Sequence, residues 1–518
     1  MTTYTAITFA PVQGFIEKSR KLRDLYGASL ILSYLSQQLV LEAEKTTEVI
    51  SPALANVHKG MPNRILLKGE FSPTQIQETL LSAWKGILQE CRTWIEAKLP
   101  DYKYHWEREW TNWGNHTWEF FWGEGDSIQQ AMDNLETRKL SRGWTAVNWI
   151  GESSSLTGTD AIAFPGLGAE DRNPQNRQWT KEKNEIKTFY HSLACVLENR
   201  PQEAEPEGKF FALNEKLSIP ELVKRLVTLP EIAHNLEMSK LESFSEIYRS
   251  SEAKNDSGKG RWTGWFMGDG DEVGKHLKEL AKKENGDDEI KKFSQAMRHW
   301  GKEFNRDFPK EIGRVVYAGG DDFLGVIYRE KDQEAITAKQ AFAWLSKLPE
   351  EWQKHKQQIG LSVGFVWAGS SVPQRDILQH CREAEKLAKS SGRGRVTIRI
   401  VFNSGQYVQW TCPWDYLDIL TKYQDREHES NWSHVYQDLA QLESRRAFNI
   451  DKNTFTEKFI IEFFDIYFPG EGKQFLNYES AKHIVGFSEE DESFDRAKTT
   501  IDWISNLIKV GWHLCSNT

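Results

Sequence analysis

The chain has 518 residues, a formal net charge of −9 and a pI near 5.9. This length predicts about three or four domains, and the acidic balance argues against a protein that binds nucleic acid on its own through a broad basic face. No run of eighteen apolar residues occurs, and the first residues lack the order of a signal peptide. We therefore expect no membrane association and a cytoplasmic location.

Residues 1–165 alternate between strand-like and helical segments. Strand composition is found at Tyr4–Ala10 and again at 47–50, 64–68 and 117–122, with helical patterns after the first strand and at 74–99. This β-α-β-β alternation predicts a first palm domain of the ferredoxin-like type. It has no GGDD sequence, so we expect a structural or accessory half that holds the acceptor nucleotide.

Residues 166–258 are largely helical in pattern and are expected to link this palm to a second one. Within them, Ser251–Lys259 (SEAKNDSGK) has the composition of a mobile linker.

Residues 259–405 carry the elements of a second palm. A strand-like run ends at Asp269, an apolar helical stripe extends from Ile290 to Phe308, and strands follow at 312–318 and 323–328. A helix at 334–348, a strand at 360–367, a helix at 376–390 and a strand at 395–402 complete the pattern. The order β-α-β-β-α-β-α-β predicts a ferredoxin-like sheet, so the fold class is α+β with two palms.

The sequence YAGGDDFL at 317–324 is the most informative motif of this second palm. Gly319 and Gly320 can take the positive φ angles of a hairpin turn, and Asp321 and Asp322 then stand where carboxylates hold Mg²⁺ against a triphosphate. An ordinary hairpin with solvated acids is the alternative.

Asp269, followed by Gly270 in WFMGDGDEVG, supplies the partner that this motif needs. Nucleotidyl transfer uses two divalent ions roughly 4 Å apart, bridged by carboxylates. Strand ends on neighbouring strands can provide such a pair, and Asp269 and Asp322 are the best candidates. We expect Mg²⁺ or Mn²⁺ at Asp269, Asp321 and Asp322.

Four basic residues surround the glycines of SSGRGR: Lys386, Lys389, Arg393 and Arg395. They are candidate ligands of a triphosphate, or a solvated basic cap that complements the helix dipole. For Lys386, Arg393 and Arg395 the two interpretations are evenly balanced.

Residues 406–518 are predicted to be helices and contain no cluster that suggests chemistry. We expect a bundle that docks other subunits.

Five segments in order resemble the large polymerase-like subunit of type III CRISPR effector complexes, most closely the Cmr (type III-B) branch. The resemblance covers most of the chain from Ile7 to Gly405. These segments are FAPVQGFIEKSRKLRDLYGASLILSYL, GESSSLTG, WFMGDGDEVG, YAGGDDFL and REAEKLAKSSGRGR.

The resemblance implies synthesis of cyclic oligoadenylate from ATP when the assembled complex, with its CRISPR RNA and other subunits, holds a matching target RNA. It implies metal-binding and catalytic roles for Asp269, Asp321 and Asp322. Nucleotide binding would fall to Gly270, the turn glycines Gly319 and Gly320, Lys389 and Arg393.

The sequence departs from this family pattern at two points. Many members begin with an HD nuclease domain, whereas no His-Asp dipeptide occurs here, so we expect no HD nuclease activity. Related segments carry cysteines where GESSSLTG has serines, and the five cysteines form no CxxC pair, so no structural zinc is expected.

Two alternative functions remain open at this point. The first is a catalytically silent scaffold subunit of the same complex, against which the intact aspartates argue. The second is a diguanylate-cyclase-like enzyme, because GGDDF differs by one methylene from GGDEF, but the first palm and the helical tail do not fit it.

Overall fold

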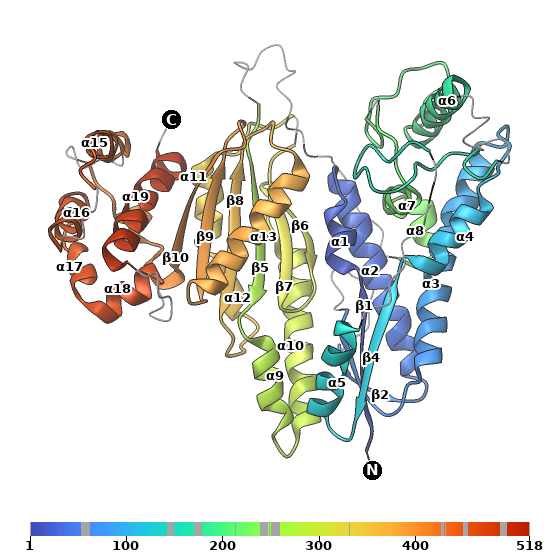
Figure 1. Ribbon diagram of the computed structural model, residues 1–518, viewed down its shortest axis with the longest axis horizontal. Coiled ribbons are helices and arrows are strands. Elements are labelled where there is room, and N and C mark those ends of the chain that lie inside the picture. Colours follow the sequence, from blue (N-terminus) through green and yellow to red (C-terminus); the bar gives the residue numbers. More distant parts are fainter. Residues whose placement is uncertain are drawn as a thin grey trace. The chain divides into compact units, whose positions relative to one another are not determined.

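The computed structural model describes two compact units, each built around one β-sheet (Figure 1). Unit 1 comprises Met1–Glu246 and Leu277–Lys302, and unit 2 comprises Ile247–His276 and Glu303–Thr518. The predicted linker Ser251–Lys259 lies outside the described residues. The described residues are 2–52, 63–141, 149, 151–169, 179–212, 214–238, 247, 249, 260–330, 332–425, 429, 431–448, 454–486 and 495–516.

The sheet of unit 1 has the order β2-β3-β1-β4, and all its pairs are antiparallel. From β4 to β2 the strands follow the order 4-1-3-2, which is the order of a ferredoxin-like sheet. This order confirms the prediction of a ferredoxin-like first palm. The central strand β1 is buried over its middle five residues. The strands are β1 (Tyr4–Ala10), β2 (Glu48–Ser51), β3 (Ile65–Lys68) and β4 (Glu119–Gly125).

The helices of unit 1 pack around this sheet and around one another. Helix α3 begins where Ser72 and Gln75 form a capping box ahead of Pro73, which explains its start. Helices α7 and α8, from the predicted helical link, pack against the palm helices α2 and α3. The helices are α1 (Val12–Glu17), α2 (Leu22–Ala43), α3 (Pro73–Lys98), α4 (Glu107–His116), α5 (Ile128–Leu140), α6 (Trp179–Leu197), α7 (Ile219–Leu226) and α8 (Pro230–Asn235).

The sheet of unit 2 has the order β10-β9-β8-β5-β7-β6. Strands β8, β5, β7 and β6 repeat the order 4-1-3-2, and β9 is added parallel to β8. The strands are β5 (Thr263–Gly270), β6 (Gly313–Ala318), β7 (Asp322–Ile327), β8 (Leu361–Ala368), β9 (Arg395–Val401) and β10 (Tyr407–Pro413).

Strand β10 corrects the prediction that residues from 406 onward are helical. Gly405, at φ +83°, turns the chain so that Tyr407–Pro413 pairs antiparallel with β9. Trp410 and Cys412 alternate toward the buried side of this strand, a period of two that the surrounding helical patterns obscured.

Helices cover both faces of this sheet. Phe266 of β5 stacks with Phe308, which follows α10 directly, and contacts Trp344 of α11, so these two aromatic side chains cover its face. Helix α13 lies across β8, β9 and β5 (Figure 1). The helices are α9 (Val273–Ala281), α10 (Gly286–Asp307), α11 (Ala338–Leu345), α12 (Leu348–Gln353) and α13 (Gln374–Ser390).

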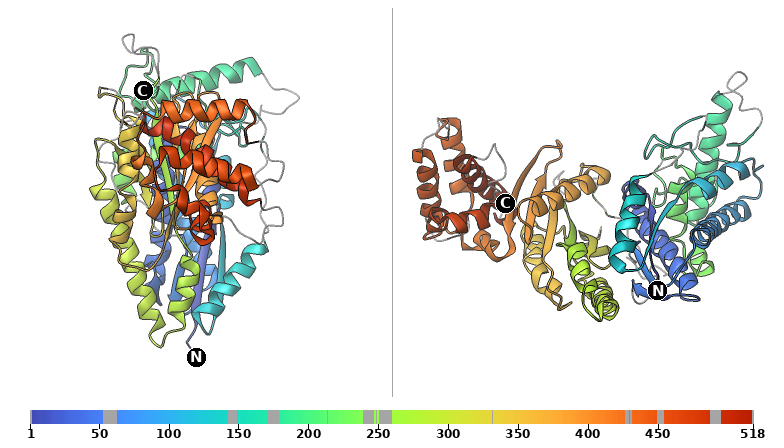
Figure 2. Two further views of the ribbon diagram at one scale, coloured as in Figure 1. Left: turned by 90° about the vertical axis from the view of Figure 1, so that its left-hand side faces the viewer. Right: turned by 60° about the horizontal axis from the view of Figure 1, so that its bottom comes forward.

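The last helices of unit 2 form a bundle beside β10 (Figure 2), with α19 packed on that strand and on α16. Of the helices in the described ranges, none combines the length and apolarity that crossing a membrane requires. The helices are α14 (Ile419–Lys422), α15 (Ser433–Ser444), α16 (Thr454–Tyr467), α17 (Gly472–Leu476), α18 (Tyr478–Val485) and α19 (Arg496–Cys515).

Candidate active site

Two aspartates on neighbouring strands face each other at one end of the unit 2 sheet. Strand β5 pairs antiparallel with β7, and the register sets Asp269 directly opposite Asp322. In such a pair the two side chains leave the same face of the sheet. The structure thus brings together the two carboxylates that were predicted as a bridging pair.

The GGDD turn is held by backbone contacts at both ends. Gly319 N–H donates to the Asp322 carbonyl at 2.8 Å, and Gly270 N–H donates to the Asp321 carbonyl at 2.8 Å. A Cβ on Gly270 would lie 2.9 Å from Val273 Cγ2 and 3.2 Å from Asp321 Cβ, so this close approach requires glycine.

Of the two turn glycines, only Gly320 adopts a positive φ (+134°). The expected positive φ is therefore found at Gly320 and not at Gly319. The turn is closed by the Gly319 hydrogen bond and needs a single residue in the glycine region.

Lys389 is the cation of this cluster. It projects from the last turn of α13, and its ammonium donates to Asp269 Oδ2 and lies 2.6 Å from Glu385 Oε1. Burial lowers the pKa of Lys389, but the hydrogen bonds and charges of Asp269 and Glu385 outweigh burial and raise it overall. Lys389 therefore stays charged and neutralises only part of the surrounding negative charge.

The carboxylates are crowded, and their pKa values show it. Desolvation raises the pKa of Asp269, although Lys389 opposes the change. Asp322 is exposed at the end of its strand, yet its surroundings desolvate the carboxylate, and the charges of Asp321 and Asp269 add to that effect. Together they raise the pKa of Asp322 to about 8. The charges of Asp321 and Asp269 thus oppose the ionisation of Asp322.

Asp271 is a buried residue of this corner whose role was not predicted from the sequence. Its Oδ1 accepts from Ser362 Oγ at 2.6 Å, and its Oδ2 accepts from Gly394 N–H at 2.8 Å. Asp271 thereby ties the end of β5 to β8 and to the SSGRGR turn. The alternation of strand β5 offered a signal, because Asp269 and Asp271 are two residues apart and share a face.

The other basic residues near the turn divide into two groups. Lys386 and Arg393 are exposed, and Arg393 sits at φ +62° in the left-handed region between two glycines. Arg395 is buried and donates to the carbonyls of His483 and Ile484 at the end of α18. Arg395 thus anchors the C-terminal bundle, while the side chain of Arg393 is accessible at the turn.

The residues present suit a metal ion that arrives with its substrate. In the described part of the chain, no three His, Cys, Asp or Glu side chains converge as a ready metal cage. Mg²⁺ is typically held by one or two carboxylates together with substrate phosphates. The opposed pair Asp269 and Asp322 fits that mode of binding.

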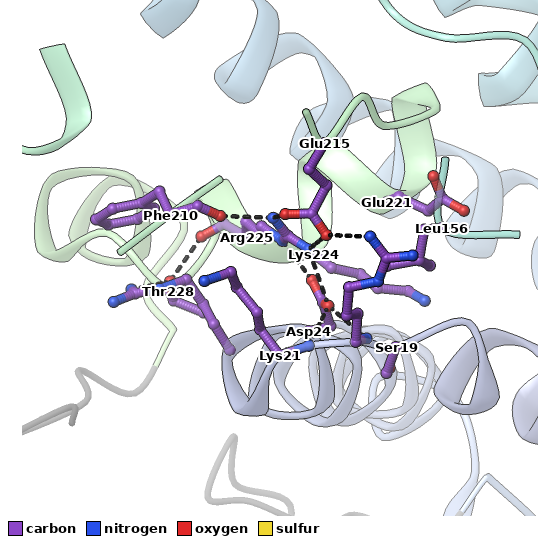
Figure 3. A network of polar contacts seen from close by, with 12 residues as sticks. Ser19, Lys21, Asp24, Leu156, Phe210, Glu215, Glu221, Lys224, Arg225 and Thr228 are labelled. Carbon is purple, nitrogen blue, oxygen red and sulfur yellow. Dashed lines mark hydrogen bonds and ion pairs between the residues drawn. The ribbon is translucent and has the colours of Figure 1, made fainter. Parts of the chain in front are cut away.

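The motif residues of unit 1 form a different cluster (Figure 3). Arg225 of α7 donates to Asp24 Oδ1 and to Glu215 Oε2, each at 2.6 Å, and all three side chains are at most 1% exposed. Lys224 donates to the backbone carbonyls of Phe15 and Lys18. These contacts fasten α2 to α7.

The GESSSLTG segment joins the same cluster. Ser154 Oγ and Thr157 Oγ1 donate to Glu221, whose other contact is the Ser218 N–H at 2.8 Å. Every charge here has a partner, so the residues that carried much of the resemblance have a structural role in unit 1.

Comparison with protein families supports the resemblance. Residues 262–397 match the family described as Cas10/Cmr2, second palm domain, and residues 4–60 match the family described as CRISPR-associated protein Cmr2, N-terminal. The first match contains every candidate site residue from Asp269 to Arg393.

Solved structures resemble the chain over nearly its whole length. A chain of the type III-B Cmr-beta complex in the apo state is 11% identical, with a TM-score of 0.56, covering 98% of this chain and 82% of that one. Csm1-Csm4 cassettes in complex with cA4 and with one ATP give TM-scores of 0.47 and 0.48 at 13% and 14% identity, covering 99% of this chain and 70% of each. No curated protein matches the sequence.

Proposed function

Since residues 4–60 and 262–397 match the Cmr2 N-terminal and Cas10/Cmr2 second palm families, we propose that the chain is a large subunit of a type III CRISPR complex and makes cyclic oligoadenylate from ATP. Synthesis is triggered when the assembled complex, with its CRISPR RNA, binds target RNA. The observation that carries this proposal is the opposed pair Asp269 and Asp322 beside Lys389, on the face of a palm sheet.

The carboxylates of this corner serve the divalent ions. Asp269 and Asp322 would hold two Mg²⁺ or Mn²⁺ ions, with Asp321 adjacent in the turn. Such ions neutralise triphosphate charge and make the attacking hydroxyl more acidic. The crowding that raises the pKa of Asp269 and Asp322 is relieved when positive charge binds between them.

The backbone and the basic groups position the nucleotide. Gly270, Gly319 and Gly320 let the phosphates approach the turn closely. Lys389 contacts the triphosphate as a point charge, and Arg393 contacts it from the SSGRGR turn. The acceptor 3′-hydroxyl then loses its proton to water and attacks the α-phosphate in line; a P–O bond forms, and pyrophosphate leaves with the electrons of the α,β P–O bond that breaks.

The assembled complex incubated with target RNA, Mg²⁺ and either ATP or GTP tests this proposal. Ring-shaped adenylate products are expected from ATP and none from GTP. No product with either nucleotide would indicate a scaffold, and cyclic di-GMP would indicate the cyclase alternative.

The double substitution Asp321→Ala with Asp322→Ala tests the site itself. It should abolish synthesis and leave RNA-guided binding intact, since the turn is at the surface. The control pair Asp332→Ala with Glu334→Ala removes two exposed acids of another loop and should leave synthesis unchanged. Synthesis retained in the first variant would contradict the site assignment.

A further inference from the structure

A second row of side chains lies directly inside the carboxylates on the same face of the sheet. Tyr317 of β6 pairs with Leu324 of β7, which pairs with Met267 of β5. Leu324 is two residues after Asp322 and Met267 is two before Asp269, so the row shares their face, about 7 Å further along the strands. Any nucleotide with its phosphates at the carboxylates extends over one of the neighbouring rows.

The chemistry of this row suits a nucleoside. Met267 is half-buried and Leu324 is fully buried, so the row offers an apolar surface that is partly accessible at Met267. The next row inward, with Trp265 and Val326, is fully buried. The accessible part of this face therefore ends one row behind the carboxylates.

Tyr317 is the polar residue of this row. It is half-buried on the edge strand β6, and neither its hydroxyl nor its ring has a hydrogen bond or ring contact to another part of the described chain. A tyrosine whose ring packs against protein usually places its hydroxyl on a partner. The hydroxyl of Tyr317 is instead a hydrogen-bond donor without a partner in the described chain, beside the proposed site.

The surroundings of Tyr317 keep its hydroxyl protonated. Desolvation raises the pKa of Tyr317 well above its usual value, and the carboxylates Asp322 and Asp269 raise it further, while Arg382 opposes them. The phenol therefore remains protonated and acts as a hydrogen-bond donor rather than as a base.

We propose that Tyr317 recognises the sugar of the bound nucleotide by donating a hydrogen bond from its phenol to a ribose hydroxyl. This inference rests on the proposed nucleotide site at Asp269 and Asp322. The sugar is the part of a nucleotide that follows its α-phosphate, so it lies over the row behind the carboxylates. An unpartnered donor in an otherwise apolar row discriminates against a substrate that lacks the matching oxygen. Tyr317 is thus a specificity-determining residue for ribonucleotides over deoxyribonucleotides.

Equilibrium binding to the full-length protein tests this proposal. The ligands are the α,β-methylene analogues of ATP, 2′-deoxy-ATP and 3′-deoxy-ATP, in which the bond to be broken is replaced so that no turnover interferes. Tyr317→Phe should weaken binding of the ribose analogue about three- to tenfold, as expected for one neutral hydrogen bond. It should leave one of the two deoxy analogues unchanged, and that analogue identifies the hydroxyl.

A matched control is Tyr407→Phe, which removes a phenol hydroxyl from exposed Tyr407 of β10 and should change none of the three affinities. Equal weakening of all three analogues by Tyr317→Phe, or no change in any of them, would overturn the proposal. If the wild-type protein binds no nucleotide, both the inference and the proposed site fail. If binding discriminates as expected but no cyclic product forms, the inference stands and only the proposed synthesis fails.

Discussion

The molecule contains two clusters of charged residues that differ in how their charges are balanced. In unit 1, Arg225 lies between Asp24 and Glu215, buried, with a partner for each group (Figure 3). In unit 2, Asp269, Asp321 and Asp322 crowd one another, and Lys389 is in direct contact with Asp269. Opposite charges that pair in the interior are typical of a structural contact, whereas crowded carboxylates with raised pKa values at strand ends are typical of a functional site.

The two clusters shift carboxylate pKa values in opposite directions. Burial raises the pKa of Asp24, but the charge and hydrogen bonds of Arg225 outweigh burial and hold it below its usual value. The pKa of Asp322 is raised instead. The substitutions below should therefore separate stability from activity, because the first cluster is buried and paired and the second is the proposed active site.

Asp322→Asn should have the largest effect on activity. The amide keeps the shape of the side chain but removes the charge that would hold a metal ion, which contributes several kcal/mol to the transition state. Cyclic oligoadenylate synthesis should fall at least about a thousandfold. The thermal unfolding midpoint should stay equal or rise, since repulsion with Asp321 and Asp269 is relieved. A lower midpoint would show that Asp322 supports the fold.

Arg225→Met should have the largest effect on stability. It leaves Asp24 and Glu215 buried without their cation, and breaking a buried pair in this way costs about 3–5 kcal/mol. Denaturant unfolding should show that loss. The exposed Lys45→Met, which breaks a surface pair with Glu42, is the control and should change stability by less than about 1 kcal/mol. Equal effects of the two substitutions would contradict the structural role of the cluster.

Much of this contrast could be predicted from the sequence, because local patterns were strong. The runs around GGDD and the run ending at Asp269 have strand composition, and the ferredoxin-like order brings those strands together. Sequence alone therefore placed Asp269 and Asp322 on neighbouring strands.

The features that the sequence did not predict depend on tertiary structure. Asp271 binds Ser362 and Gly394, residues about ninety and more than a hundred and twenty positions away, and no local pattern encodes such partners. The sequence predicts helix at strand β10 because the seven residues of this strand lie at the start of a long helical region. Its pairing with β9, rather than its own pattern, decides its conformation.

Asp271→Ala should have an intermediate effect that sharpens the distinction between binding and positioning residues. It removes both carboxylate oxygens that accept from Ser362 and Gly394, so about 1–3 kcal/mol of positioning is lost. Arg393 would be displaced with the turn. We expect KM for ATP to rise about tenfold with kcat changed less. A loss confined to kcat, with KM unchanged, would contradict this role.

The smallest expected effect is the opposite pH dependence of the two clusters. The folded-state pKa of Asp322, about 8, exceeds its ordinary value of 3.8, so between these pH values the folded state binds a proton that the unfolded state has lost. Stability from this group should therefore fall as pH rises from about 4 to 8 in metal-free buffer. For Asp24 the folded pKa is lowered, so its contribution is present above pH 3.8 and is lost as pH falls below it. Unfolding midpoints of wild type and Asp322→Asn measured across this range should converge at the acidic end and separate toward pH 8. Parallel curves would show that the crowding of the carboxylates in unit 2 has no energetic consequence.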